Sequence, residues 1–318
     1  MKRVFAILVA VVLTLSTNAQ RGELSRFERM FTTEADWGVA EEVQEGDVVF
    51  NELMPFVSEG RSKFVELYNR SARIIDLKTL MIANWSEEGE YSKVKLLSDT
   101  TLLLMPGQYV VLAPDTNNIM CAAGRNSEAL YLHNSLPLFS STTTSLVILS
   151  QDSMVVDKIK YSLDWHSEAI EDRHDVSLER IDPNGVTQDS MNWHSAASTV
   201  GYQTAGWENS QRIAVAAGSE ERFWLVDGNT FSPNNDGYQD VLKVGYNLPA
   251  EGFVISMRVY TRSGALVRTV YENWVVNRDG VLMYDGEGIE TGLYVMRVEA
   301  FRSSGEKYGK NLVFIKAK

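Results

Sequence analysis

Two stretches of the sequence hold side chains that could bind a metal ion, and the first is SPNNDGYQD, residues 232–240. Asn234, Asp236 and Asp240 supply oxygen ligands there, around the flexible Gly237. Ca²⁺ takes about six to eight oxygens, so carbonyls and waters would have to complete the shell. The spacing is not that of an EF-hand loop, and such residues are typical of turns whose side chains bond their own backbone. We weigh a Ca²⁺ site against a turn and favour the turn.

The second stretch is DWHSEAIEDRHD, residues 164–175. Its imidazoles and carboxylates are of the kinds that ligate Zn²⁺ and other divalent ions. His166 and His174 do not have the HExxH spacing, and a loop is expected between the flanking strands. A solvated acidic loop is favoured over a metal or hydrolase site. The candidate ligands of the alternative are Asp164, His166, Glu168, Glu171, Asp172, His174 and Asp175.

No other pattern points to catalysis. The sequence holds no Ser-His-Asp, phosphate-loop, dinucleotide-binding or zinc-finger motif, and its single cysteine cannot form an internal disulfide. We therefore expect a protein that is not an enzyme, without catalytic residues. No cofactor is expected apart from the possible calcium.

The chain begins with MKRVFAILVAVVLTLSTNAQ, which has two basic residues, a short apolar run and small residues before Gln20. This order predicts a secretory signal peptide over residues 1–19, followed by a polar lead-in over 20–45. No later apolar run reaches the roughly 18 residues of a membrane span. We expect a protein that crosses the inner membrane and resides in the periplasm, on the outer-membrane surface or outside the cell.

Charge is unevenly distributed along the chain. Residues 20–221 carry a net charge of −15 and residues 222–318 a net charge of +1. Phosphate backbones are bound by clustered Lys and Arg, so the acidic part is expected to repel nucleic acid. A well-solvated surface explains the acidity most simply.

The elements that must position these residues are strands. Short runs rich in Val, Ile, Leu and Tyr recur, separated by Gly, Pro, Asn, Asp or Ser, which predicts β-sandwiches. The fold class expected is all-β, with two immunoglobulin-like β-sandwich domains in tandem. The first covers 46–211, a linker covers 212–222 and the second covers 223–318. The clearest runs are DVVFNEL, KFVELYN, IIDLKTLMIANW, KVKLL, TLLLMPGQYVVLAP, SLVILS, VVDKIKYS and SLERI, then VLKVGYNL, FVISMRVYT, ALVRTVYE, GLYVMRVEAF and KNLVFIKAK.

The first region resembles the lamin-tail domain. The stretch 48–82 contains the Asn51-Glu52 pair, the strand Glu66-Leu67-Tyr68-Asn69 and then Asp76-Leu77, in the order typical of that family. LMPGQYVVLA, VVDKIKYS and the closing GYQTAGWENSQ are also similar, although bacterial copies have Thr-Pro-Gly where this chain has Thr-Ala-Gly. The resemblance covers about residues 46–211.

The second region resembles the immunoglobulin-like domain of the flagellar hook-capping protein, in the form found on secreted proteins of gliding bacteria. FSPNNDGYQDVL, VYTRSGALVRTVYE and DGVLMYDGEGIETGLYVMRVEAF carry this resemblance. The end of the chain is also similar to a type IX secretion sorting domain. Neither family supplies catalytic residues, so both resemblances imply a secreted, cell-surface protein built for contacts.

Individual polar and aromatic residues have simple structural interpretations. Asn51 and Glu52 are expected to hydrogen-bond loop backbone, and Glu66 to be a solvent-facing or structurally paired carboxylate. Two functions remain open. The favoured one is a non-enzymatic adaptor that binds a protein or glycan at the envelope, with the last domain as stalk or export module. The alternative is an accessory domain or hydrolase with a metal site in 164–175.

Overall fold

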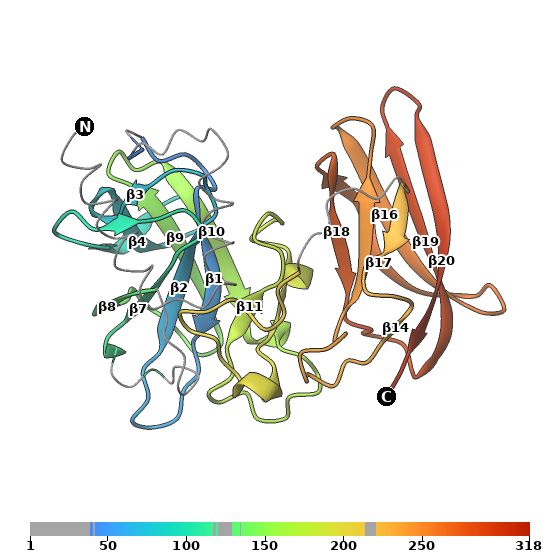
Figure 1. The fold of residues 1–318 in the computed structure, drawn as a ribbon, viewed down its shortest axis with the longest axis horizontal. Coiled ribbons are helices and arrows are strands. Elements are labelled where there is room, and N and C mark those ends of the chain that lie inside the picture. Colours follow the sequence, from blue (N-terminus) through green and yellow to red (C-terminus); the bar gives the residue numbers. More distant parts are fainter. Residues whose placement is uncertain (1–38, 41, 117–118, 120–128, 134, 214–220) are drawn as a thin grey trace, which may run out of the picture. The chain divides into compact units, whose positions relative to one another are not determined.

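A computed structural model describes residues 39–40, 42–116, 119, 129–133, 135–213 and 221–318 (Figure 1). Residues 40–318 form one compact unit. The expected signal peptide, residues 20–38 and 41 of the lead-in and residues 214–220 of the expected linker lie outside the described residues. Within the described part, no helix has the length and apolar character needed to cross a membrane.

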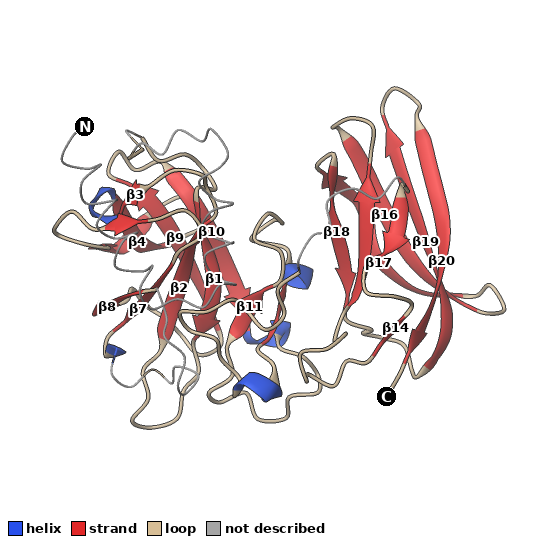
Figure 2. Ribbon diagram, viewed as in Figure 1, coloured by secondary structure: helices blue, strands red, loops and turns tan. Residues whose placement is uncertain are grey.

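The described chain is built from strands joined by turns, with short 3-10 turns as its helical elements (Figure 2). The prediction of an all-β protein made of β-sandwiches is thereby confirmed.

The first sandwich pairs a six-stranded sheet with a four-stranded sheet. The six-stranded sheet has the order β12-β11-β1-β2-β7-β8, and the four-stranded sheet has the order β10-β9-β4-β5. Their strands are β1 (Val48–Met54), β2 (Phe64–Asn69), β4 (Leu80–Trp85), β5 (Tyr91–Leu96), β7 (Tyr109–Ala113), β8 (Leu130–His133), β9 (Thr143–Ser150), β10 (Val155–Ser162), β11 (Leu178–Arg180) and β12 (Trp193–Ser195). The short strands β3 (Ile75–Asp76) and β6 (Leu103–Leu104) pair with each other.

Alternation of side chains along these strands places the core between the two sheets. In β10, Val156, Ile159 and Tyr161 are buried while Lys158 and Lys160 face solvent. The pairing of β1 with β2 shifts register between Phe50 and Glu52. This bulge lets Phe50 and Leu53 both enter the core although they are three positions apart.

The second sandwich pairs a three-stranded sheet, β13-β15-β18, with a five-stranded sheet, β14-β20-β19-β16-β17. A separate apolar core fills the space between them, with Phe253, Met257, Val298 and Phe314 at its centre. The strands are β13 (Phe223–Leu225), β14 (Thr230–Phe231), β15 (Leu242–Asn247), β16 (Phe253–Thr261), β17 (Leu266–Val276), β18 (Asp279–Tyr284), β19 (Gly292–Arg302) and β20 (Lys307–Lys316).

Most strands lie within the expected apolar runs. Strands β8, β12, β13, β14 and β18 have no counterpart among the expected runs. Most of them are short or mixed in polarity, so their apolar pattern alone does not mark them.

Candidate functional site

Three glutamates lie side by side on adjacent strands of the six-stranded sheet. Glu52 of β1 is opposite Glu179 of β11 and opposite Glu66 of β2. All three are fully buried. They lie on the face of the sheet turned away from the core, and we call Glu52, Glu66 and Glu179 the glutamate row.

Several hydrogen-bond donors meet the carboxyl groups of the glutamate row. Glu66 accepts from Asn51 Nδ2 at 2.7 Å and from the Gly206 N–H at 2.5 Å. Glu179 accepts from Ser210 Oγ at 2.7 Å and from the Gln211 N–H at 3.0 Å. Buried charged or polar groups are stable only when they are paired in this way.

Glu52 accepts hydrogen bonds from Ser177, which precedes β11, and from Thr204, which follows β12 in the chain. It accepts from Ser177 Oγ at 2.5 Å, from the Thr204 N–H at 2.9 Å and from Thr204 Oγ1 at 3.1 Å. The same Thr204 hydroxyl lies 2.6 Å from Glu179 Oε1. A hydroxyl has one hydrogen to donate, so both contacts are hydrogen bonds only if one of the two carboxyl groups carries a proton. The geometry thus fits a proton on Glu52 or Glu179 that is donated to the Thr204 hydroxyl.

Burial and mutual repulsion favour that protonated state. Burial, and next the charge of Glu179, raise the pKa of Glu52 to about 8. Burial also raises the pKa of Glu179 to about 6. The pKa of Glu66 is raised well above its ordinary value by burial and by the neighbouring Glu52. At neutral pH the row therefore holds fewer than three negative charges.

Residues 202–213, which we call the closing segment, cover the glutamate row. Besides the donors from Thr204, Gly206, Ser210 and Gln211, the segment contributes Asn209, whose side chain bonds Asn51 and the carbonyl of Arg180. Arg212 donates to the hydroxyls of Tyr109 and Tyr68. The row is therefore enclosed between sheet and segment rather than open to a substrate.

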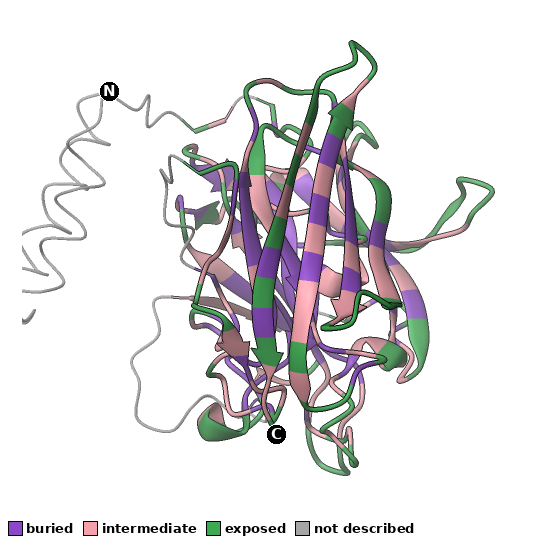
Figure 3. Ribbon diagram, turned by 90° about the vertical axis from the view of Figure 1, so that its right-hand side faces the viewer, coloured by how far each residue is buried: buried purple, intermediate pink, exposed green. Residues whose placement is uncertain are grey.

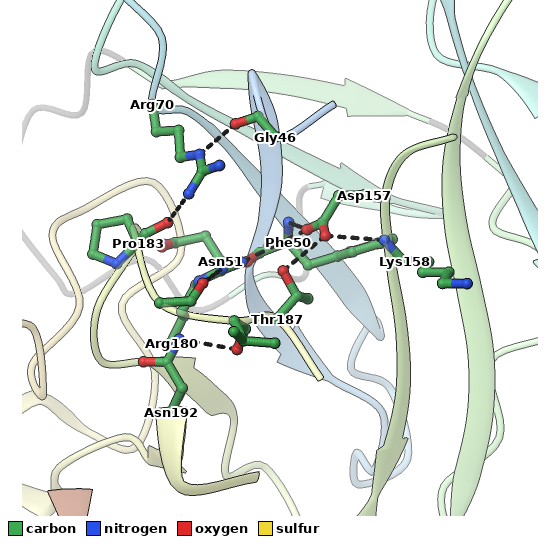
Figure 4. Close-up of polar contacts among 12 residues, drawn as sticks. Gly46, Phe50, Asn51, Arg70, Asp157, Lys158, Arg180, Pro183, Thr187 and Asn192 are labelled. Atoms are coloured by element: carbon green, nitrogen blue, oxygen red, sulfur yellow. Dashed lines mark hydrogen bonds and ion pairs between the residues drawn. The ribbon is translucent and has the colours of Figure 1, made fainter. Parts of the chain in front are cut away.

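A second buried charge lies beside β1. Arg180 is 1% exposed, and it donates to the carbonyls of Phe50 at 3.0 Å, Asp182 at 3.1 Å and Gly185 at 2.6 Å. Asp157 lies 3.6 Å from its guanidinium group (Figure 4). Burial lowers the pKa of Arg180 to about 10, which still leaves it charged at neutral pH.

Asp157 is satisfied mainly by other donors. The backbone N–H of Phe50, the Thr187 hydroxyl and the N–H of Lys158 donate to its two oxygens at 2.7–3.0 Å (Figure 4). Arg180 and Asp157 thus tie strands β1, β10 and β11 together with the loop at residues 182–187. This is a structural tie, because no exposed reactive atom belongs to it.

The candidate ligands in 164–175 do not converge. His166 is 4% exposed and its Nδ1 lies 2.9 Å from Ser195 Oγ, whereas His174 is exposed and bonds Asp172. Burial lowers the pKa of His166 to about 3, so its ring is neutral. Among the described residues, which include this whole loop, no three or more His, Cys, Asp or Glu side chains are arranged to hold a metal ion.

The loop at 232–240 is organised by its own carboxylates. Asp240 is buried and accepts from the N–H groups of Asn235 at 2.6 Å and Gly237 at 2.7 Å. Asp236 accepts from the N–H of Tyr238 at 2.8 Å, and Asn234 accepts from the N–H of Asp236 at 3.1 Å. These are bonds of side chains to nearby backbone, as in Asx turns. The Ca²⁺ site at Asn234, Asp236 and Asp240 stays a prediction.

The same loop is bonded to the closing segment and its neighbours. Gln211 Nε2 donates to Asp240 at 2.9 Å, while Asn235 Nδ2 donates to the carbonyl of Ala196 at 2.8 Å. A small apolar cluster beside them contains Ile181, Ile213, Val241 and Met283. Gln211 thus connects Glu179 in the first sandwich with Asp240 in the second.

Part of this arrangement follows from sequence. Glu52 bonds the backbone N–H of Thr204, as expected, whereas the Asn51 side chain bonds the side chains of Glu66 and Asn209 instead of loop backbone. Glu66 is the structurally paired carboxylate of the two alternatives given for it. Glu179, Thr204 and Arg180 were not expected as buried partners. For Glu179 and Arg180 the one signal is that apolar residues flank the pair on both sides in SLERI, which places charged side chains inside a buried strand.

The described surface also has an edge strand with exposed apolar side chains in the first sandwich. β5 pairs with β4 alone and is largely exposed along its length. Tyr91, Val94 and Leu96 are 39%, 46% and 51% exposed. Leu138 lies nearby, 66% exposed and bonded through its backbone to Asn84 of β4. We call Tyr91, Val94, Leu96 and Leu138 the β5 edge.

Comparison with known proteins gives little. No protein-family model matches the chain, and no curated protein matches it. Among solved structures, the chain is similar to one from a study of PorZ of Porphyromonas gingivalis, described as an essential bacterial surface component of the type-IX secretion system. Identity is 10% and the TM-score 0.22, over 85% of this chain and 39% of that one. Such a low TM-score supports no inference, and the resemblances to lamin-tail and hook-capping domains stay predictions.

Proposed function

We propose that this chain is a non-enzymatic adaptor of the bacterial envelope or cell surface, which binds a protein or glycan through its β-sandwiches. The observation that carries the proposal is the β5 edge. Exposed apolar side chains that lie together beside an edge strand can add binding energy to a contact with a partner. Single exposed apolar residues are ordinary, and four near one edge support an interaction site there.

The chemistry inside the molecule supports the same view. The glutamate row, Arg180 and Asp240 are bonded to backbone and side chains within the fold, and these bonds explain their burial. The resemblances to the lamin-tail and hook-capping families add to this, because neither supplies catalytic residues. From the resemblance alone, the second sandwich would be a stalk or a type IX-type export module.

Binding can be tested with purified full-length protein immobilised on beads and incubated with envelope extract, and in parallel on a glycan array. Val94→Glu combined with Leu96→Glu should reduce capture of the partner at least about tenfold, since charge is depleted from the centre of interfaces. Lys93→Glu, in the same strand, is the control for added negative charge. Capture that is the same for all three proteins would reject the β5 edge as the binding surface.

The alternative, a hydrolase with a metal site in 164–175, makes a different prediction. His174 is exposed, so His174→Ala should leave both the fold and partner capture unchanged if the chain is an adaptor. A metal-dependent hydrolase using this loop would bind Zn²⁺ in the wild type and lose that binding in the variant. Calorimetric titration with Zn²⁺ separates the two functions without knowledge of the substrate.

A further inference from the structure

The five-stranded sheet of the second sandwich has an outer face, turned away from the core, that carries several exposed apolar side chains. Leu266, Leu293 and Val313 on it are 55%, 45% and 50% exposed. In Figure 3, exposed or half-exposed residues alternate with buried ones along the strand that leads to the C-terminus and the strand next to it. Contiguous exposed apolar patches on soluble proteins mark interaction sites.

Strand pairing orders this face into rows that run across the strands. One apolar row near one end contains Val313, Val295, Tyr260 and Leu266, from β20, β19, β16 and β17 in turn. An apolar row at the other end contains Phe301, Val254 and Val275, next to Lys307.

Charged residues of both signs lie between the apolar rows. One row contains Arg297 and Arg258, and the next row contains Glu299 and Ser256. Arg297 Nη2 lies 3.0 Å from Glu299, and the Arg258 guanidinium lies 3.5 Å from it. These side chains are between about a quarter and under half exposed, so they remain accessible to a partner.

This order is self-complementary. Consider a two-fold axis that lies in the plane between two such faces, at right angles to the strands, and passes over Val298 of β19. This axis places β19 of one copy against β19 of the other, and the two strands run in opposite directions. Arg297 then faces Glu299 of the second copy, and Val295 faces Phe301. The same axis crosses β16 at Met257, the partner of Val298 in the sheet, and so brings Tyr260 onto Val254.

We propose that two copies of this chain associate face to face through the outer surface of this sheet. Sheets that pack in this way are separated by about 10 Å, which the apolar side chains of both rows can fill. A face with charges of one sign would favour a partner of the opposite charge. This face carries charges of both signs between apolar rows, which favours an isologous contact with a second copy of itself. The proposal does not depend on the β5 edge or its partner.

Sedimentation equilibrium of the full chain tests the dimer. The wild type should associate, and Arg297→Glu or Glu299→Arg should each weaken association at least about tenfold, because the symmetry brings like charges together twice. An equimolar mixture of R297E and E299R should associate again, since one face is then acidic and the other basic. Lys93→Glu in the first sandwich should have no effect on association.

Restoration in the mixture is the decisive result, because neither misfolding nor a general charge effect can produce it. Phe301→Ser should weaken the wild-type dimer without altering its charge. A wild type that stays monomeric up to about 0.1 mM would overturn the proposal, since even weak specific contacts associate there. A dimer that is insensitive to R297E, E299R and Phe301→Ser would overturn it equally.

Discussion

Buried charges in this chain are each surrounded by several hydrogen-bond partners. Arg180 donates to three backbone carbonyls, and Glu52 accepts from Ser177 and Thr204. Removing a single member of such a group leaves the remaining polar atoms buried without partners, which costs more than the bond itself contributed. Each of these residues therefore contributes more to stability than the sum of its individual hydrogen bonds.

Arg180→Met should lower the free energy of unfolding by about 3–5 kcal/mol, the range for removing one partner from a buried ionic group. The carbonyls of Phe50, Asp182 and Gly185 would lose their donor, and Asp157 would lose its nearest cation. Urea denaturation followed by tryptophan fluorescence measures the change. Arg278→Met, at an exposed position, is the matched control and should change stability by less than about 0.5 kcal/mol. Similar values for the two variants would show that Arg180 is not a structural tie.

At the scale of elements, the closing segment is the piece that makes the first sandwich complete. It holds few apolar residues, but its backbone N–H groups and hydroxyls meet the carboxyl groups of the row. Ala205 adds an apolar contact with Met54 and Phe64 on the same face of the sheet. A segment with this polarity is attached to the sheet mainly by directed hydrogen bonds.

Thr204→Val should loosen the closing segment, because valine keeps the shape of the side chain but cannot connect Glu52 with Glu179. The expected loss of stability is about 1–3 kcal/mol, and Thr204→Ser, which keeps the hydroxyl, should lose much less. Hydrogen exchange should show faster exchange at the amides of Gly206 and Gln211 in the valine variant. Equal exchange in the valine and serine variants would contradict the role given to the hydroxyl.

The loop at 232–240 is the element in which calcium remains to be decided. If its carboxylates only accept hydrogen bonds within the protein, the full chain should melt at the same temperature in Ca²⁺ and in EDTA. A bound ion at a hundred times its dissociation constant would add about 2.7 kcal/mol, or roughly 5 °C or more for a chain of this size. Asp236→Ala should abolish any such difference. Asp240→Ala should lower the melting temperature in both buffers, because three donors lose their acceptor.

Strand positions were predictable where apolar residues alternate over six or more positions, as in β10 and β16. The glutamate row was only partly predictable. Asn51, Glu52 and Glu66 are marked by short patterns, but Thr204 and Ser210 lie about 150 residues away in a segment without strand pattern. Their proximity depends on a path of the chain that local sequence does not encode.

At the scale of the whole molecule, the two sandwiches have separate apolar cores, and both a polar contact and a small apolar cluster connect them. Gln211 forms the polar contact, because its backbone N–H donates to Glu179 and its side chain donates to Asp240. The pKa of Glu52 is raised to about 8 in the fold, against 4.5 for an ordinary glutamate. Between these values Glu52 is protonated in the folded chain and ionised in the unfolded chain.

The contribution of Glu52 to stability must fall as pH rises from about 5 to about 8. A group with a raised pKa stabilises the fold fully below its unfolded pKa and loses that contribution as pH passes its folded pKa. The slope from one such group is at most about 1.4 kcal/mol per pH unit. Buried His166, whose pKa is lowered to about 3, contributes a slope of the opposite sign below about pH 6.5, so only the comparison with a Glu52 variant isolates the row. In Glu52→Gln, the amide donates to Thr204 in place of the acid proton, so the part of the slope due to Glu52 should disappear.

The most direct measurement is therefore the free energy of unfolding in urea, at pH 5 to 9, for the wild type, Glu52→Gln and the exposed control Glu59→Gln. We expect Glu52→Gln to lose less stability with rising pH than the wild type and the control do, and to be the most stable of the three at pH 9. A difference in stability between Glu52→Gln and the wild type that stays the same from pH 5 to pH 9 would contradict a protonated structural row.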